Sequence, residues 1–437
     1  MPLVALALVC LFGAGLRSWH LGIPQANSAT GAGYVFDERY YVAAAEIIAG
    51  EAAGAGNIYA GTAPAGADPN GEHPQLGKMI IAAGIAFAGN NAIGWRIGAV
   101  LFGLAALALL YWLVRCAGGT PWLAVGASAI ASVDNLWVVH SRIAVLDIYV
   151  VPFMLAGAAF YLRRQPLVAG ALIGIGCCVK EFAAYTLFVL VALELMRMAG
   201  DRFAPSAGAP PAVPVRRRLR SLLGVAAVTG LCYVTLLAAL DTVVTPYSGG
   251  RPVDRGEASW CADTLIWSDA CNHIVFMARY AAQLHGSGGI ASAPPEWWLD
   301  RKAVTYFELT KTIHQPGAPA KKVTVIWYRG EISRVLLYTS WAALLAAAWW
   351  AIRRRDDLSF LVLAWALGTW LPAELSHAID NRTTYLYYMV VTMPALYIGT
   401  ARLLASKRIP WLVVAAWAAA LLIDGALLYP IRTLSGT

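Results

Sequence analysis

The chain has 437 residues, of which 59% are hydrophobic and only 13% are charged, where a typical soluble chain carries about 25% charged residues. Its mean hydropathy of +0.60 comes from many separate apolar runs, which excludes an ordinary soluble protein. The net charge of +8 does not indicate nucleic-acid binding, because the basic residues lie in short connections between apolar runs, as cytoplasmic membrane anchors do.

The apolar runs predict an all-α membrane protein with about eleven transmembrane helices, each approaching the roughly 20 residues needed to cross the hydrocarbon layer. The first run lacks a clear cleavage site and is interpreted as a retained helix. The expected helices cover 3–19, 94–115, 121–139, 143–162, 166–179, 182–198, 221–244, 335–352, 358–374, 384–402 and 409–430.

Every second connection between these helices is rich in arginine, and this pattern sets the expected orientation of the chain in the membrane. Arg115, Arg163, Arg164, the run 216–220 and the run 353–355 fall on one side, and the other side has few basic residues in its short turns. The positive-inside rule therefore places the N-terminus in the cytoplasm and the C-terminus outside.

Two polar segments are too long to be turns, and both fall outside under this topology. We expect an N-terminal membrane module at 1–244 that includes a first outer loop at 20–93, a second outer loop at 245–334, and C-terminal helices at 335–437. The Pro/Ala-rich tract 199–219 predicts a cytoplasmic linker.

Two of the seven cysteines, Cys261 and Cys271, lie in the second outer loop. An oxidising outer face allows a disulfide between them, and a free pair is the alternative. No His/Cys spacing predicts a metal site.

An acidic pair, Asp37 and Glu38, opens a helix-like run in the first outer loop that ends at Gly50. A helix N-terminus stabilises negative charge, which would keep Asp37 ionised and able to accept a proton. The alternative is a simple capping role for Asp37.

Cations gather at the outer boundary, where the positive-inside rule disfavours them. A lipid-linked phosphate is the natural partner of Arg and Lys there. Interfacial anchoring, or local pairing of Arg142 with Asp134 or Asp147 and of Lys180 with Glu181, is the alternative. The cations are Lys78, Arg96, Arg142, Lys180 and Arg382. His73 lies shortly before Lys78 in the sequence.

Four stretches resemble the motifs of the protein O-mannosyltransferase family of GT-C glycosyltransferases, in that family's order. They are FDERYY at 36–41, EHPQLGK at 72–78, SRIAVLD at 141–147 and NRTTYLYYMVVTMPAL at 381–396. The stretch at 245–334 carries no β-trefoil repeat, so the chain resembles the compact prokaryotic form.

The resemblance implies an inverting transfer of mannose from a polyprenyl-phosphate donor to Ser/Thr hydroxyls of a polypeptide, without a cofactor or metal. By match with the family, Asp37 is the general base, and Glu38 orients the site. Donor phosphate would be bound by Arg96, Arg382, Lys78 and Arg142. Supporting roles would fall to His73, Asp147, Lys180 and Tyr385.

Two alternatives remain open. A related GT-C enzyme would move another lipid-linked sugar to a lipid or glycan with the same base and cations. A transporter would place ionisable groups near the bilayer midplane, whereas here they gather at the outer boundary. We expect an integral protein of a prokaryotic plasma membrane, with its site on the extracytoplasmic face.

Overall fold

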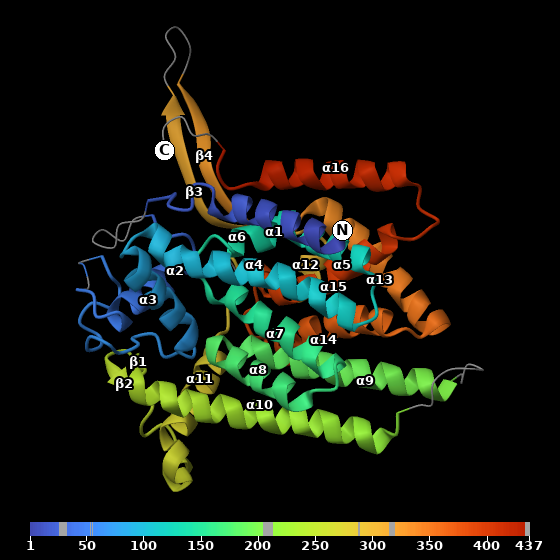
Figure 1. The fold of residues 1–437 in the computed structure, drawn as a ribbon. Coiled ribbons are helices and arrows are strands. Elements are labelled where there is room, and N and C mark those ends of the chain that lie inside the picture. The colour runs from blue at the N-terminus through green and yellow to red at the C-terminus, as the bar shows by residue number, and fades with distance from the viewer. Residues whose placement is uncertain are drawn as a thin grey trace.

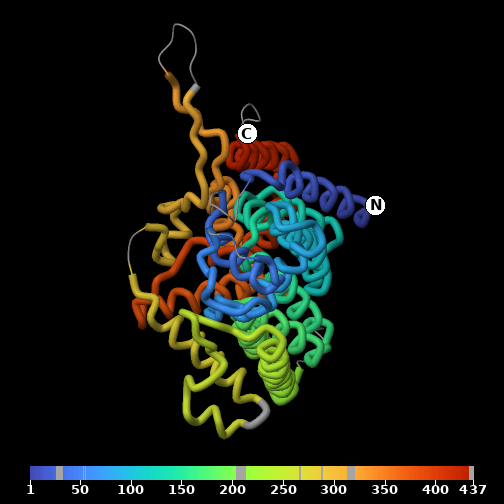
Figure 2. The backbone as a smooth tube through the Cα atoms, turned by 90° about the vertical axis from the view of Figure 1, so that its left-hand side faces the viewer, coloured from blue at the N-terminus to red at the C-terminus, as the bar shows by residue number. Residues whose placement is uncertain are grey.

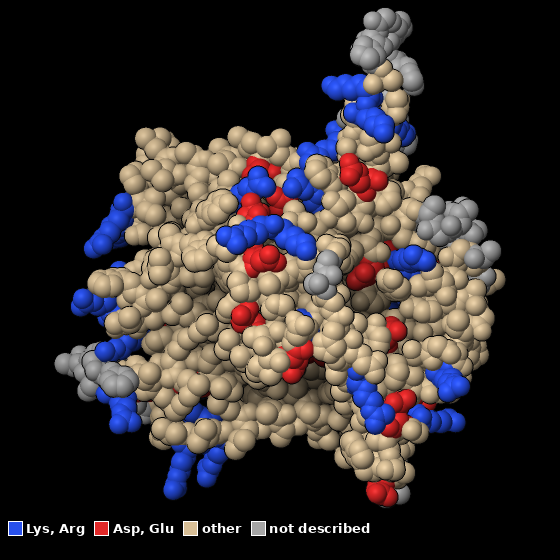
Figure 3. All heavy atoms as spheres, turned by 180° about the vertical axis from the view of Figure 1, so that it is seen from behind, with Lys and Arg blue, Asp and Glu red and all other residues tan. Residues whose placement is uncertain are grey.

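The computed structural model describes residues 1–25, 33–52, 54, 56–203, 213–286, 289–313 and 320–432. Its core is a bundle of helices whose two long loops gather at one end, called here the loop end (Figure 1). The opposite end carries the short connections and a row of Lys and Arg side chains at the edge of the bundle (Figure 3). The all-α bundle with two large loops is thus confirmed.

The first half of the chain supplies α1 to α10. The helices are α1 (Pro2–Ser18), α2 (Glu38–Ile48), α3 (Leu76–Ala88), α4 (Ala92–Cys116), α5 (Pro121–Val133), α6 (Asn135–His140), α7 (Leu146–Leu162), α8 (Pro166–Val179), α9 (Tyr185–Phe203) and α10 (Val215–Val243), with a 3-10 turn η1 (Glu181–Ala184) before α9. The predicted linker 199–219 lies partly outside the described residues, between α9 and α10.

The second half begins with the loop 245–334 and ends with four helices. The loop holds β1 (Tyr247–Ser248), β2 (Arg251–Pro252), η2 (Ser259–Trp267), α11 (Ser268–Gln283), α12 (Pro294–Trp298), β3 (Val304–Ile313) and β4 (Lys321–Gly330). The remaining elements are α13 (Arg334–Arg354), α14 (Asp357–Asp380), η3 (Leu386–Val391), α15 (Met393–Leu404) and α16 (Trp411–Leu428).

Every predicted apolar segment is helical, but two of them are interrupted. The segment 121–139 breaks at Asp134, which has an extended backbone and accepts a hydrogen bond from the Trp137 N–H, so that α6 begins there. The segment 384–402 begins as η3, and α15 begins next to Pro394. Among the described residues, six helices are long and apolar enough to cross a membrane, and the count of eleven spans stays a prediction.

The second loop contains a hairpin that the sequence analysis did not predict. Strands β3 and β4 pair antiparallel from Val304–Gly330 to Ile313–Lys321. The hairpin projects past α16, crosswise to the bundle (Figures 1 and 2). Trp327 lies on β4 of this hairpin, while Trp297 of α12 is buried against Tyr388.

Candidate active site

Asp37 lies at the N-terminus of α2, in a turn that two aromatic contacts hold in place. Phe36 before it has φ of 57°, a left-handed backbone that is costly for a non-glycine residue. Its N–H donates to the Tyr306 carbonyl on β3, and its ring stacks on the Tyr306 ring at 4.3 Å between centroids. An edge contact with Tyr387 completes the support. The second loop therefore fixes the direction in which Asp37 leaves the chain.

The Asp37 carboxyl occupies the capping position of α2 but makes no capping hydrogen bond. It has no ion pair or hydrogen bond with any residue that the structure describes. Burial raises the pKa of Asp37 to about 7, the charge of Lys180 opposes that rise and the charge of Asp147 adds to it. Burial therefore works against the ionisation of Asp37 that the helix terminus was expected to support.

Glu38, the next residue, is in the opposite situation. Both of its carboxylate oxygens bind Arg96, at 2.7 and 2.8 Å, and they also accept hydrogen bonds from the Val35 and Ala144 N–H groups. Arg96 additionally donates to two carbonyls near the end of α1, and neither side chain is exposed. The pair joins α2, α4 and the turn before α7. The pair is compatible with the orienting role expected for Glu38, and phosphate binding by Arg96 stays a prediction that these contacts do not favour.

Arg142 and Lys78 also bind groups of the protein itself, although the buried Arg142 Nε has no hydrogen-bond partner. Arg142 donates to the carbonyls of Leu16, Arg17 and Trp19 at 2.6, 3.0 and 2.8 Å, where it satisfies the C-terminal end of α1. Lys78 forms a buried ion pair with Asp68. Both cations are fully buried. The phosphate-binding role expected for both stays a prediction that these contacts do not favour, and Arg142 pairs with neither Asp134 nor Asp147.

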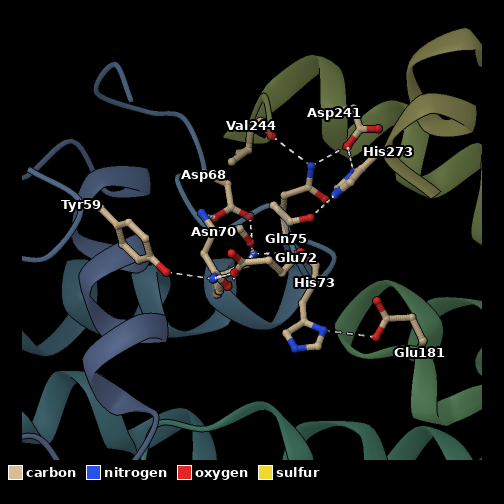
Figure 4. Close-up of polar contacts among 12 residues, drawn as sticks. Tyr59, Asp68, Asn70, Glu72, His73, Gln75, Glu181, Asp241, Val244 and His273 are labelled. Atoms are coloured by element: carbon tan, nitrogen blue, oxygen red, sulfur yellow. Dashed lines mark hydrogen bonds and ion pairs between the residues drawn. The ribbon is translucent and has the colours of Figure 1, made fainter. Parts of the chain in front are cut away.

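Lys78 belongs to a polar network that ties the first loop to its surroundings (Figure 4). Lys78 also donates to the His73 carbonyl at 2.8 Å, and the His73 ring meets Glu181 at 3.4 Å. Glu181 therefore pairs with His73 and not with Lys180. His73 thus connects the start of α3 to η1, which agrees with the supporting role expected for it.

A buried connection missed by the sequence analysis lies in the same network. Asp241 at the end of α10 accepts from the Gln75 amide at 2.5 Å and meets His273 Nδ1 of α11 at 2.9 Å, while His273 Nε2 lies 3.0 Å from the Gly71 carbonyl (Figure 4). All the side chains are buried. This group, called here the loop clamp (Gln75, Asp241 and His273), joins both long loops to α10. The isolated Asp241 near a helix end gave no signal of it.

Two cations remain near Asp37. Lys180 forms a 2.7 Å ion pair with Asp147 and lies over the rings of Phe182 and Tyr387. Arg382 follows α14, and its buried Nε has no hydrogen-bond partner. Its side chain makes no ion pair with the described residues. Arg382 interacts electrostatically with Tyr185, Tyr385 and Tyr388, the tyrosines beside Asp37 and Lys180.

Stacked tyrosines fill the space between these charges. Tyr385 lies parallel to Tyr387 with centroids 5.2 Å apart, and Tyr388 meets Tyr387 edge-on at the same distance. Asp37 acts electrostatically on both Tyr385 and Tyr387. The sequence pointed to Tyr385 alone. The candidate site is thus an aromatic cluster beside the Asp37 carboxyl, Lys180 and Arg382.

The disulfide allowed by the sequence is present. Cys261 and Cys271 are bonded, with Cα atoms 5.5 Å apart. The bond joins η2 to α11, the helix that carries His273 of the loop clamp.

Comparisons with known proteins agree with this arrangement. Residues 86–237 match the family model described as dolichyl-phosphate-mannose-protein mannosyltransferase. Relatives named polyprenol-phosphate-mannose–protein mannosyltransferase, from Mycobacterium tuberculosis and Mycolicibacterium smegmatis, are 23% and 25% identical over 83% of this chain, and the matches cover 77% and 78% of their lengths.

Three solved structures share the fold. The S. cerevisiae protein O-mannosyltransferase Pmt1-Pmt2 complex bound to the sugar donor has a TM-score of 0.64 at 11% identity, covering 98% of this chain and 90% of that one. ArnT from Cupriavidus metallidurans bound to undecaprenyl phosphate has a TM-score of 0.55 at 15% identity, covering 97% and 63%. The Archaeoglobus fulgidus oligosaccharyltransferase has a TM-score of 0.53 at 13% identity, and the chain covers just 57% of its length.

The chain is an integral membrane helix bundle that shares its fold with these glycosyltransferases and is similar in sequence to the mycobacterial mannosyltransferases. The resemblance to the protein O-mannosyltransferase family, indicated by the four sequence motifs, is confirmed by the family model and the mycobacterial relatives.

Proposed function

We propose that this protein transfers mannose from a polyprenyl-phosphate donor to Ser or Thr hydroxyls of polypeptides. The observation that carries the proposal is the Asp37 carboxyl, which is mostly buried, makes no bond to the described residues and has its pKa raised to about 7. A general base works best with a pKa near the working pH. The relatives named for this activity support the choice of sugar and acceptor.

The proposed reaction is a single displacement with inversion. Asp37 removes the proton of the acceptor hydroxyl as its oxygen bonds to the anomeric carbon, and the bond from that carbon to the phosphate oxygen breaks on the opposite face. The leaving phosphate keeps the bond electrons and needs no proton. Arg382 and Lys180 would stabilise the growing negative charge, since preorganised cations act strongly in a site with little water.

The aromatic cluster suits contact with a sugar and its carrier. Tyr385, Tyr387 and Phe36 offer ring faces, while tyrosine hydroxyls offer hydrogen bonds. Lys180 and its partner Asp147 lie at the same site, and we assign to Asp147 the positioning of Lys180 by their 2.7 Å ion pair.

The proposed orientation has the loop end outside the cell and the N-terminus in the cytoplasm of a prokaryote. The Lys and Arg side chains at the opposite end support it, because cytoplasmic connections are enriched in these residues (Figure 3). Reporter fusions at the C-terminus test this orientation, with an extracytoplasmic reporter expected to be active.

The test of the base is Asp37→Asn, which removes the proton acceptor and keeps the shape. Transfer to a Ser/Thr peptide should fall about 10²- to 10⁴-fold, the usual contribution of a general base. Binding of the polyprenyl-phosphate donor should persist. Glu51→Gln is the matched control, because Glu51 is exposed in the same loop. Full turnover by Asp37→Asn would remove Asp37 from the mechanism.

A second candidate function is transfer of a different polyprenyl-phosphate-linked sugar to a lipid or glycan. The ArnT structure bound to undecaprenyl phosphate shares this fold and motivates the comparison. A side-by-side assay with protein and lipid acceptors separates the two. Labelled hexose on Ser/Thr peptides supports protein mannosylation, and label found only on a lipid supports the alternative.

A further inference from the structure

An apolar cavity of about 560 Å³ lies on the opposite face of α6 from the tyrosines of the active site. It is called here the α1–α16 groove, and its lining includes Phe12, Gly15 and Leu16 of α1, Leu422 and Gly425 of α16, and Asn135 of α6. On the other face of α6, His140 hydrogen-bonds to Tyr306 and contacts the Tyr387 ring. The groove is therefore separate from the site of Asp37.

The groove stays open although small residues line both helices. Glycines at a membrane helix interface normally let two backbones approach closely. Here the position that a Cβ of Gly15 would occupy has no atom within 4 Å. Neighbouring side chains of α16, such as Leu422, Ile423 and Leu427, are exposed. An apolar space of this size between membrane helices, open to the lipid, fits a hydrocarbon chain.

One buried polar atom in the groove wall has no partner. Asn135 is 2% exposed, and its amide nitrogen donates to the Arg329 and Glu331 carbonyls at 2.9 and 2.8 Å. These two bonds fix the amide, and its Oδ1 is left buried without a hydrogen bond. A buried unsatisfied acceptor is costly. A ligand that carries a hydroxyl or N–H donor next to its chain would satisfy it.

Two arginines share one indole ring at the end of the groove. The guanidinium carbons of Arg329 and Arg432 lie 4.4 and 5.7 Å from the Trp327 ring centre. Arg432 directly follows Ile431, which lines the groove, and it is fixed by its N–H bond to the Val325 carbonyl. Arg329 is paired with Glu331, whereas the Arg432 side chain has no ion pair among the described residues. The cluster therefore keeps a net positive charge.

The hairpin above this cluster adds positive charge. Lys321 and Lys322 are exposed on β4 and Lys311 lies on β3. Lys and Arg side chains gather on the hairpin (Figure 3), which extends past α16, crosswise to the bundle helices (Figure 1). Basic segments beside a membrane attract anionic lipids at about 1 kcal/mol per residue.

We propose that the α1–α16 groove binds one anionic phospholipid of the surrounding leaflet. Its acyl chain would fill the apolar groove, its phosphate would meet Arg432 beside Trp327, and a hydroxyl of its headgroup or glycerol would donate to Asn135 Oδ1. The donor lipid of the proposed reaction has to present its phosphate to Arg382, on the other side of α6. This requirement argues against the donor lipid as the occupant of the groove. The inference does not depend on the proposed function.

The experiment uses the full-length protein in nanodiscs of phosphatidylcholine with phosphatidylglycerol, released into native mass spectrometry. We expect wild type to retain one phosphatidylglycerol. Gly15→Phe fills the groove and should abolish retention. Arg432→Gln removes one charge-assisted contact and should weaken retention about tenfold. Gly230→Phe is the matched control, because Gly230 of α10 is also exposed with no atom within 4 Å of its Cβ position.

Equal retention by Gly15→Phe and Gly230→Phe would overturn the proposal, as would equal retention of phosphatidylcholine and phosphatidylglycerol by wild type. Polyprenyl phosphate is added in a second arm. We expect that polyprenyl phosphate does not displace the bound phospholipid. Stoichiometric displacement would assign the groove to the isoprenoid lipid instead. Retained lipid is the readout throughout, so the result is independent of any transferase assay.

Discussion

Two neighbouring regions at the loop end treat their charges in opposite ways. Around Arg96, every charged group is saturated: Glu38 receives four hydrogen bonds, and Arg96 gives its remaining ones to backbone carbonyls. Around the stacked tyrosines, the Asp37 carboxyl has no bond to the described residues, and the Nε of Arg382 has no partner. Glu38 and Arg96 are fully buried and Asp37 and Arg382 are half-buried, so the two regions differ in burial as well as in bonding.

The difference follows from the cost of burying charge. A buried ion whose hydrogen bonds are complete is inert, because a substrate would have to replace strong bonds. A buried carboxyl without bonds is destabilised as an anion, and this is the condition that makes it a good proton acceptor. The saturated region therefore positions the open one. Glu38 and Asp37 are adjacent in the chain, so the hydrogen bonds that hold Glu38 also fix the position of Asp37.

The largest expected effect comes from breaking the saturated region. Arg96→Gln leaves Glu38 buried without its partner and should destabilise the protein by about 3–5 kcal/mol. Thermal unfolding in detergent micelles measures the loss. Arg334→Gln is the control, since Arg334 also pairs with acids but is 58% exposed.

The pairing itself is tested by a double variant. Glu38→Gln together with Arg96→Gln should lose less stability than the two single variants combined, because no uncompensated charge remains. An additive loss, or an unchanged melting temperature in Arg96→Gln, would contradict the structural assignment of this pair.

Arg382 tests the open region. Arg382→Gln should raise the donor KM or lower kcat by about 10- to 100-fold, since a charge-assisted bond to phosphate contributes about 1.5–3 kcal/mol. The fold should be unaffected, because the side chain makes no ion pair with the described residues. Arg353→Gln, which removes an arginine that lies over Trp349 at the other end of the bundle, is the matched control. Unchanged kinetics in Arg382→Gln would contradict the assignment of Arg382 to the donor phosphate.

The loop clamp should have a smaller effect, mainly on the second loop. His273→Gln removes a ring that bridges Asp241 and the Gly71 carbonyl, and we expect a loss of about 1.5–3 kcal/mol. Limited proteolysis should cut 245–334 faster than in wild type. His285→Gln, an exposed histidine of the same loop, is the control. Identical cleavage rates would show that the clamp does not hold the loop.

The sequence predicted the bundle well because apolar length and arginine placement are local signals. It pointed to Asp37, Arg382 and Tyr385 by their motifs and to Lys180 as a cation at the outer boundary. It could not separate them from Glu38, Lys78, Arg96 and Arg142, because saturation depends on partners far along the chain: Arg96 meets Glu38 across 58 positions and Arg142 meets Leu16 across 126. The β3–β4 hairpin was missed because it lies in a segment where aromatic residues suggested interfacial helices.

The smallest expected effect is the pH dependence, and it has a definite sign. The base must be ionised to accept a proton, and the pKa of Asp37 is raised to about 7. Transfer should therefore increase by roughly tenfold between pH 6 and pH 8 and then level off. Stability should change in the opposite direction: a carboxyl with a raised pKa favours the folded state when protonated, so its contribution falls as the pH rises from about 4 toward 7. Asp37→Asn should remove both effects, giving a higher melting temperature than wild type at pH 8. If wild-type activity did not change between pH 6 and pH 8, the ionisation of Asp37 would not control the catalytic step.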